Sequence, residues 1–83
     1  MDLTKFSFID TARGIRGGFS HTSHLREGNA VIATGKAHWG NRTWEFAPFW
    51  TSRKAAIKKA MAVKGVTKDR LAELQALLDT YKD

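Results

Sequence analysis

An alternation of apolar and polar residues is the first pattern along the chain. Between residues 4 and 9, Phe6 and Phe8 fall on one side of an extended chain, and Lys5 and Ser7 fall on the other. A period of two residues is typical of a strand with one buried face, so we predict a strand over residues 4–9. Residues 12–18 follow with three glycines, two arginines and no periodicity, which predicts a loop.

A second β-rich region extends from residue 30 to residue 49, and the dipeptide Gly40-Asn41 divides it into two runs. Glycine and asparagine tolerate the positive φ angles of a two-residue hairpin turn. The register that follows pairs Lys36 with Glu45, Ala37 with Trp44, and Gly35 with Phe46. On the apolar face, the small residues at positions 33, 35 and 37 then leave room for two large rings across the sheet.

The dipeptide Gly28-Asn29 offers a further hairpin turn, whose register would pair Leu25 with Ile32. This register puts His24 on the same face as Trp44, while Leu25 and Ile32 fall on the other face. Either the sheet buries both of its faces, or this turn does not form.

After Pro48, the apolar residues recur with the period of a helix. The first helix has Thr51 or Ser52 as a possible N-cap and Gly65 just after its C-terminal end, and Thr67 can cap a second helix. The apolar stripes of the two helices consist of Ala56, Ile57, Ala60 and Met61, and of Leu71, Leu74, Leu77, Leu78 and Tyr81. Because each stripe needs a hydrophobic partner, we expect both helices to cover the aromatic face of the sheet.

Together these elements predict an α+β fold. A small antiparallel sheet of three or four strands, with a hairpin turning at Gly40-Asn41, precedes two C-terminal helices packed on one face. The chain has 83 residues, which is enough for one domain. We expect a single domain over residues 1–83, with a β-rich part at 1–50 and a helical hairpin at 51–83.

The positive charge of the chain is concentrated on the first predicted helix. The formal net charge is +6, from 14 Lys and Arg against eight Asp and Glu. Residues 53–64 contain no acid and five cations, which are Arg53, Lys54, Lys58, Lys59 and Lys64. Exposed helix faces commonly mix the two signs of charge, so an acid-free face favours a negatively charged partner. The alternative is a solvated face that keeps a small protein in solution.

Two further features could extend such a surface. Residues 13–19, Arg-Gly-Ile-Arg-Gly-Gly-Phe, resemble one copy of the arginine-glycine boxes of RNA-binding tails, which implies phosphate contacts by Arg13 and Arg16. Trp39 lies beside Arg42 across the end of the predicted hairpin, where an exposed ring can stack on a nucleic-acid base. The alternatives are an ordinary glycine-rich connection for the first feature and a core position for the tryptophan.

The composition narrows the classes of function. The chain has no Cys, which excludes disulfides, thiolate metal sites and cysteine nucleophiles. Its acids are scattered and no glycine-rich phosphate loop stands in the required context, so we expect neither an enzyme nor a cofactor. His21, His24 and His38 could supply zinc ligands, but no nearby pair of carboxylates completes the set, so no metal is expected. No apolar stretch approaches the ~18 residues of a membrane span, so we expect a cytoplasmic protein without a membrane partner.

We therefore expect a small binding protein with a negatively charged partner, most simply nucleic acid, either DNA or RNA. The alternative is a protein-interaction module, an inhibitor or adaptor that binds an acidic or nucleic-acid-binding groove on a larger enzyme. Compact, catalytically empty chains of this kind resemble the small proteins that bacteriophages make to disable host machinery.

Overall fold

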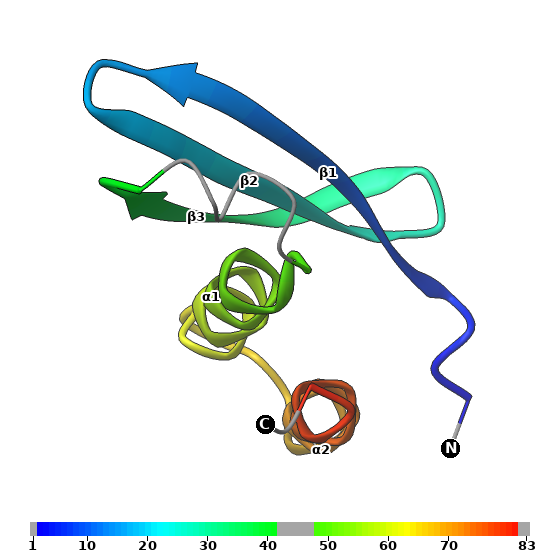
Figure 1. The fold of residues 1–83 in the computed structure, drawn as a ribbon. Helices are drawn as coiled ribbons and strands as arrows, with labels where there is room; N and C mark the ends of the chain where they lie inside the picture. The colour runs from blue at the N-terminus through cyan, green and yellow to red at the C-terminus, as the bar shows by residue number, and fades with distance from the viewer. Residues whose placement is uncertain (1, 42–47, 82–83) are drawn as a thin grey trace.

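Three strands and two helices make up the described part of the chain, residues 2–41 and 48–81 of a computed structural model. They are β1 (Phe6–Ile15), β2 (Gly18–Glu27), β3 (Ala30–Trp39), α1 (Trp50–Met61) and α2 (Lys68–Asp79). The strand order is β1-β2-β3, and both strand pairs are antiparallel. Figure 1 shows a twisted sheet with both helices on the same side of it. The predicted α+β class, with two C-terminal helices on one face of a small antiparallel sheet, is confirmed.

β1 is longer than its apolar pattern predicted. It continues beyond Ile9 and pairs with β2 along its whole length, up to the pair of Ile15 and Gly18. The loop predicted over residues 12–18 is therefore wrong, because the segment consists of strand, a short turn and strand. Gly17 supports the turn with a φ of 81°, a value that favours glycine. Residues 11–17 are all exposed, so neither face of this part needs apolar residues and no alternation appears.

The β2–β3 hairpin turns at Gly28-Asn29, where Gly28 has a φ of 61°. This turn is one of the two that the sequence predicted. Next to the turn the register also agrees with the prediction, since Arg26 lies opposite Val31.

Beyond that pair, a β-bulge shifts the register by one residue. Leu25 lies opposite Ala33, so the predicted pairing of Leu25 with Ile32 is wrong. Leu25 is fully buried, and both Ile32 and Ala33 pack against the core that contains it. The bulge thus turns two consecutive apolar residues of β3 toward the helices. It removes the conflict in the predicted register, because Leu25 now belongs to the covered face.

Gly35 lies where α1 crosses β3. A Cβ atom at this position would come within 2.2 Å of the Ser52 carbonyl oxygen and 2.3 Å of the Ala56 amide nitrogen. The absence of a side chain therefore lets the backbone of α1 approach the sheet. The sequence had suggested that the small residues of β3 make room for Trp44 and Phe46. Those rings, and the strand predicted after Gly40-Asn41, fall in residues 42–47, which lie outside the described residues.

The two helices begin in different ways. Thr67 caps α2, because its hydroxyl accepts a hydrogen bond of 3.1 Å from the Arg70 amide, as predicted. α1 begins one residue after Phe49 and has no side-chain cap, so the prediction of Thr51 or Ser52 as its N-cap is wrong. Ser52 is instead a fully buried residue in the first turn of α1.

The core lies between the sheet and the helices, toward the end of the sheet where β1 begins. Its buried members come from β1, β2 and both helices and are Phe6, Leu25, Ala56, Ile57, Ala60, Leu74 and Leu77. An aromatic cluster lies on the same face, toward the opposite end of β2. There the His21 ring lies between those of Phe49, at 4.1 Å, and Trp39, at 4.7 Å between ring centres. One face of the sheet thus holds both the core and the aromatic cluster.

Candidate anion-binding surfaces

Arg53, the first cation of the basic helix, is held by an acid from β1. Its Nε donates to both carboxylate oxygens of Asp10 at 3.1 Å, and its Nη2 forms an ion pair with the same group. Its Nη1 donates to the Tyr81 hydroxyl at 3.1 Å, and the guanidinium carbon lies 4.8 Å from the centre of the Phe8 ring. The pKa of Arg53 is raised above its ordinary value, chiefly by the hydrogen bond to Asp10.

The same carboxylate continues a polar network into the interior. The Ser23 hydroxyl donates to Asp10 at 2.6 Å and also shares a hydrogen bond of 2.6 Å with the Ser52 hydroxyl. The network therefore connects β1, β2 and α1 through side chains that lie between the sheet and the helix. Arg53 belongs to this internal network, and its charge is compensated there.

The other four cations of the basic segment lie toward solvent. Lys54 is half-buried, and together with Lys58 it lines a shallow hollow that also contains Asp79. Lys58, Lys59 and Lys64 are exposed. In the described ranges, no ion pair or hydrogen bond involves any of these three ammonium groups. Three uncompensated lysines therefore remain on the helix side of the molecule, which we call the helix surface.

Arg13 and Arg16 lie at the far end of the β1–β2 hairpin, and both are exposed. Arg13 is opposite Ser20 of β2, which in turn is opposite His38 of β3. Facing residues of an antiparallel sheet point to the same side. Since Ser23 and Gly35 mark the side that α1 covers, the parity of the strands puts Arg13 on the other side. The structure therefore does not bring Arg13 together with the lysines of the helix surface.

Trp39 is half-buried in the aromatic cluster, where its ring stacks on that of Phe19 at 5.3 Å between centres. One face of the indole is thus already occupied. Trp50, at the start of α1, has an exposed fraction of 47%. Arg42, the predicted neighbour of Trp39, lies outside the described residues.

The open side of the sheet, which no described helix covers, is a cationic surface that the sequence analysis missed as a unit. It carries Arg13 on β1, Arg26 on β2 and Lys36 on β3. No Asp or Glu of the described strands points to this side, because Asp10 and Glu27 have the opposite parity. The alternation of the three strands is the signal that would have revealed it, once both hairpin registers were known.

The acids of the sheet are instead neutralised on the covered side. Arg70 of α2 donates to Glu27 at 2.7 Å, and Lys5 lies 3.5 Å from the same carboxylate and 2.5 Å from Glu73. The hydrogen bond from Arg70 lowers the pKa of Glu27 below its ordinary value, and that with Glu73 raises the pKa of Lys5. Among the charged side chains of the three strands, the acids are thus paired on the covered side, and the cations of the open side have no ion pair within the described ranges.

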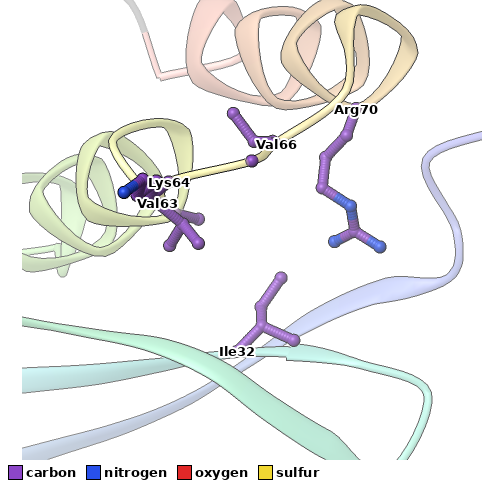
Figure 2. A pocket seen from close by; sticks show the side chains of 7 residues that line it. Ile32, Val63, Lys64, Val66 and Arg70 are labelled. Carbon is purple, nitrogen blue, oxygen red and sulfur yellow. The ribbon is translucent and has the colours of Figure 1, made fainter.

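A hollow of about 300 Å³ lies between the α1–α2 connection and β3. In Figure 2, Ile32 and Val63 point into it from opposite sides, and Arg70 reaches down from α2. Of the described lining residues only Lys64 and Arg70 carry charge, and Arg70 is already paired with Glu27. The hollow therefore offers an apolar wall and one free ammonium group, with no nucleophile or acid–base pair in its lining.

The three histidines do not come together. His21 is fully buried on the covered face, whereas His24 and His38 lie on the open face. The sheet therefore separates His21 from the other two. The described ranges contain no group of three His, Asp or Glu side chains that could hold a metal ion. The helices in those ranges are too short and too polar to cross a membrane.

Comparison with known proteins adds no relative to these observations. No protein-family model, curated protein or solved structure matches the chain. The case for a function therefore depends on the surfaces themselves.

Proposed function

We propose that this protein binds nucleic acid through the exposed lysines of the helix surface, Lys58, Lys59 and Lys64. The observation that carries the proposal is that these ammonium groups are exposed and make no ion pair within the described ranges. Unpaired cations release counterions from a polyanion at no cost in broken intramolecular contacts. Arg53 is excluded from the surface by its bond to Asp10.

The strength and salt dependence of such binding follow from the number of cations. Three phosphate contacts give a slope of about −2.7 for log K against log salt on a duplex. Binding without base readout has a dissociation constant of about 10⁻⁴ to 10⁻⁶ M at physiological salt. The chain is therefore proposed to be an accessory protein that coats or approaches nucleic acid without reading its sequence.

The second candidate is a module that binds an acidic protein surface, as an inhibitor or adaptor would. Two exposed apolar side chains favour it, because Trp50 and Val63, with exposed fractions of 47% and 54%, lie near the two ends of α1. Aromatic anchors next to cations are typical of protein interfaces. A pull-down after nuclease treatment separates the candidates, since a stoichiometric protein partner that survives it supports the second.

The proposal is tested with the double variant Lys58→Gln and Lys59→Gln and a 20-base-pair duplex of mixed sequence. We expect weaker binding and a salt slope that is shallower by about 1.8, because each lost cation contributes about 0.9. Fluorescence anisotropy between 50 and 200 mM salt measures both quantities.

The matched control is the double variant Ala12→Glu and Ala30→Glu, which lowers the net charge by the same amount. Both alanines are exposed residues of the sheet and are not part of the helix surface. An equal loss of affinity in this control, or an unchanged slope in the lysine variant, would remove the helix surface as the binding site.

A further inference from the structure

The open face of the sheet combines positive charge with hydrogen-bond donors. Its cations, Arg13, Arg26 and Lys36, come from three different strands. Arg13 and Lys36 are exposed and have no ion pair or hydrogen bond within residues 2–41 and 48–81. In the same ranges, the one side-chain hydrogen bond of Arg26 is a long one of 3.5 Å to Asn29.

The cations are spread along the strands and not gathered at one point. Arg13 lies opposite Ser20, and Arg26 is six residues farther along β2. This separation is about 20 Å at roughly 3.3 Å per residue. Lys36, opposite Thr22, lies between these positions on the other edge of the sheet. The charged area therefore has the length of about six base pairs of a duplex at about 3.4 Å each.

Two hydroxyl side chains between the cations are suited to phosphate. The hydroxyl groups of the exposed Thr11 and the half-buried Thr22 lie opposite each other in the middle of the face, and hydroxyls are common donors to phosphate oxygens. The exposed Ile9 lies beside Thr11 on the same face. The three described strands place no Phe, Trp or Tyr ring on the open side, whose rings are the imidazoles of His24 and His38. A surface without large aromatic rings lacks the strongest stacking platform for the bases of a single strand.

We infer that the open face of the sheet is a second nucleic-acid-binding surface, which takes the phosphate backbone of a duplex. The inference rests on the ligand class of the proposed function but uses different residues on the other side of the sheet. Charge complementarity selects this occupant, since the face bears three cations and, among the described residues, no acid. With the helix surface on the covered side, one molecule contacts two duplex segments at once.

The double variant Arg13→Gln and Lys36→Gln tests the inference on the full chain, with a 20-base-pair duplex and a single strand of the same length as probes. We expect the duplex salt slope to become shallower by about 1.8, as for two lost contacts at about 0.9 each. The wild-type protein should bind the duplex more tightly than the single strand. The charge-preserving variant Arg13→Lys and Lys36→Arg should keep the wild-type slope.

A matched control lowers the net charge equally, through Thr51→Glu and Ala72→Glu at exposed positions of α1 and α2 outside the lysines of the helix surface. If this control reduces the slope as much as Arg13→Gln and Lys36→Gln, only net charge matters and the inference fails. An unchanged slope in the sheet variant, or tighter binding of the single strand, overturns it as well. Capture of an acidic protein that depends on Arg13 and Lys36, with duplex binding intact, would also contradict it.

The test separates this inference from the proposed function. A loss confined to Lys58→Gln and Lys59→Gln supports the helix surface and overturns the sheet surface, and a loss confined to the sheet variant does the reverse. If both surfaces bind, wild-type protein also retains a labelled duplex on an immobilised one. Either double variant then abolishes this bridging while the other surface still binds.

Discussion

On the covered face of the sheet, Asp10 and Glu27 are each held by an arginine from a helix, whereas on the open face Arg13 and Lys36 have no acidic neighbour among the described residues. The same three strands provide both faces, and the side chains differ only in the parity of their positions. Charge on the covered face stabilises the fold, because burial makes an uncompensated ion costly. Charge on the open face is solvated and contributes little to stability. A cation count in the sequence cannot distinguish these two roles.

The largest expected effect comes from filling the space between the covered face and α1. The substitution Gly35→Ala puts a methyl group against backbone atoms of Ser52 and Ala56 that cannot rotate away. We expect a loss of about 3 kcal/mol in the free energy of unfolding, measured by urea denaturation. The control Gly14→Ala adds a methyl group that has no neighbour within 4 Å, so it should leave stability unchanged. Equal effects at the two positions would contradict the close approach of α1.

Two arginines, Arg53 and Arg13, allow a direct comparison of the covered face with the open face. Arg53→Gln leaves the Asp10 carboxylate without its partner under α1, and we expect a loss of about 2 kcal/mol in the free energy of unfolding. Arg13→Gln removes an equal charge from the open face, where we expect a change of less than about 0.5 kcal/mol. In duplex binding we expect the reverse order: Arg13→Gln weakens binding, whereas Arg53→Gln leaves it unchanged. If Arg13→Gln destabilises the protein as much as Arg53→Gln, the open face is not solvent-exposed.

His21 is a buried polar side chain on the covered face, and its contribution to stability can be tested. Both of its ring nitrogens are buried, and neither has a hydrogen-bond partner in the described ranges. Replacing an unsatisfied polar group by an apolar ring of similar shape removes a desolvation penalty. We therefore expect His21→Phe to raise the free energy of unfolding by about 1 kcal/mol. His38→Phe, on the open face, is the control and should have no stabilising effect; a lower stability of His21→Phe would indicate a partner for the ring.

The smallest effect concerns pH. Because Arg70 lowers the pKa of Glu27 in the folded protein, the unfolded state binds this proton more readily than the folded state does. The stabilisation is therefore complete above the ordinary glutamate value and is lost as the pH falls through the lower, folded value. We expect Glu27→Gln to flatten the dependence of unfolding free energy on pH between about 5 and 3. An unchanged pH profile would show that this ion pair does not contribute.

Local patterns predicted much of the fold. The first strand, the turn at Gly28-Asn29, the Thr67 cap and the two helical stripes depend on neighbours within a few residues. The hairpin strand beyond residue 10 was missed because both of its faces are exposed. There is then no alternation to detect.

The remaining features depend on contacts between distant segments. The bulge at Leu25 is set by the packing of β3 against the helices, and Gly35 is small because α1 crosses it, not because of its own strand. The partner of Arg53 comes from Asp10, 43 residues away. The sequence therefore placed Arg53 with the other cations of its helix, although the fold pairs it with an acid of β1.

Amide chemical-shift mapping with a 20-base-pair duplex, at 50 and 200 mM salt, tests the central claim most directly. If the unpaired cations are the binding surfaces, shifts should concentrate at Thr22 and Lys36 on the open face and at Lys58 and Lys59 on α1. They should weaken strongly at the higher salt concentration. Shifts confined to the hollow around Ile32 and Val66, or no shifts at 50 mM salt, would contradict the claim.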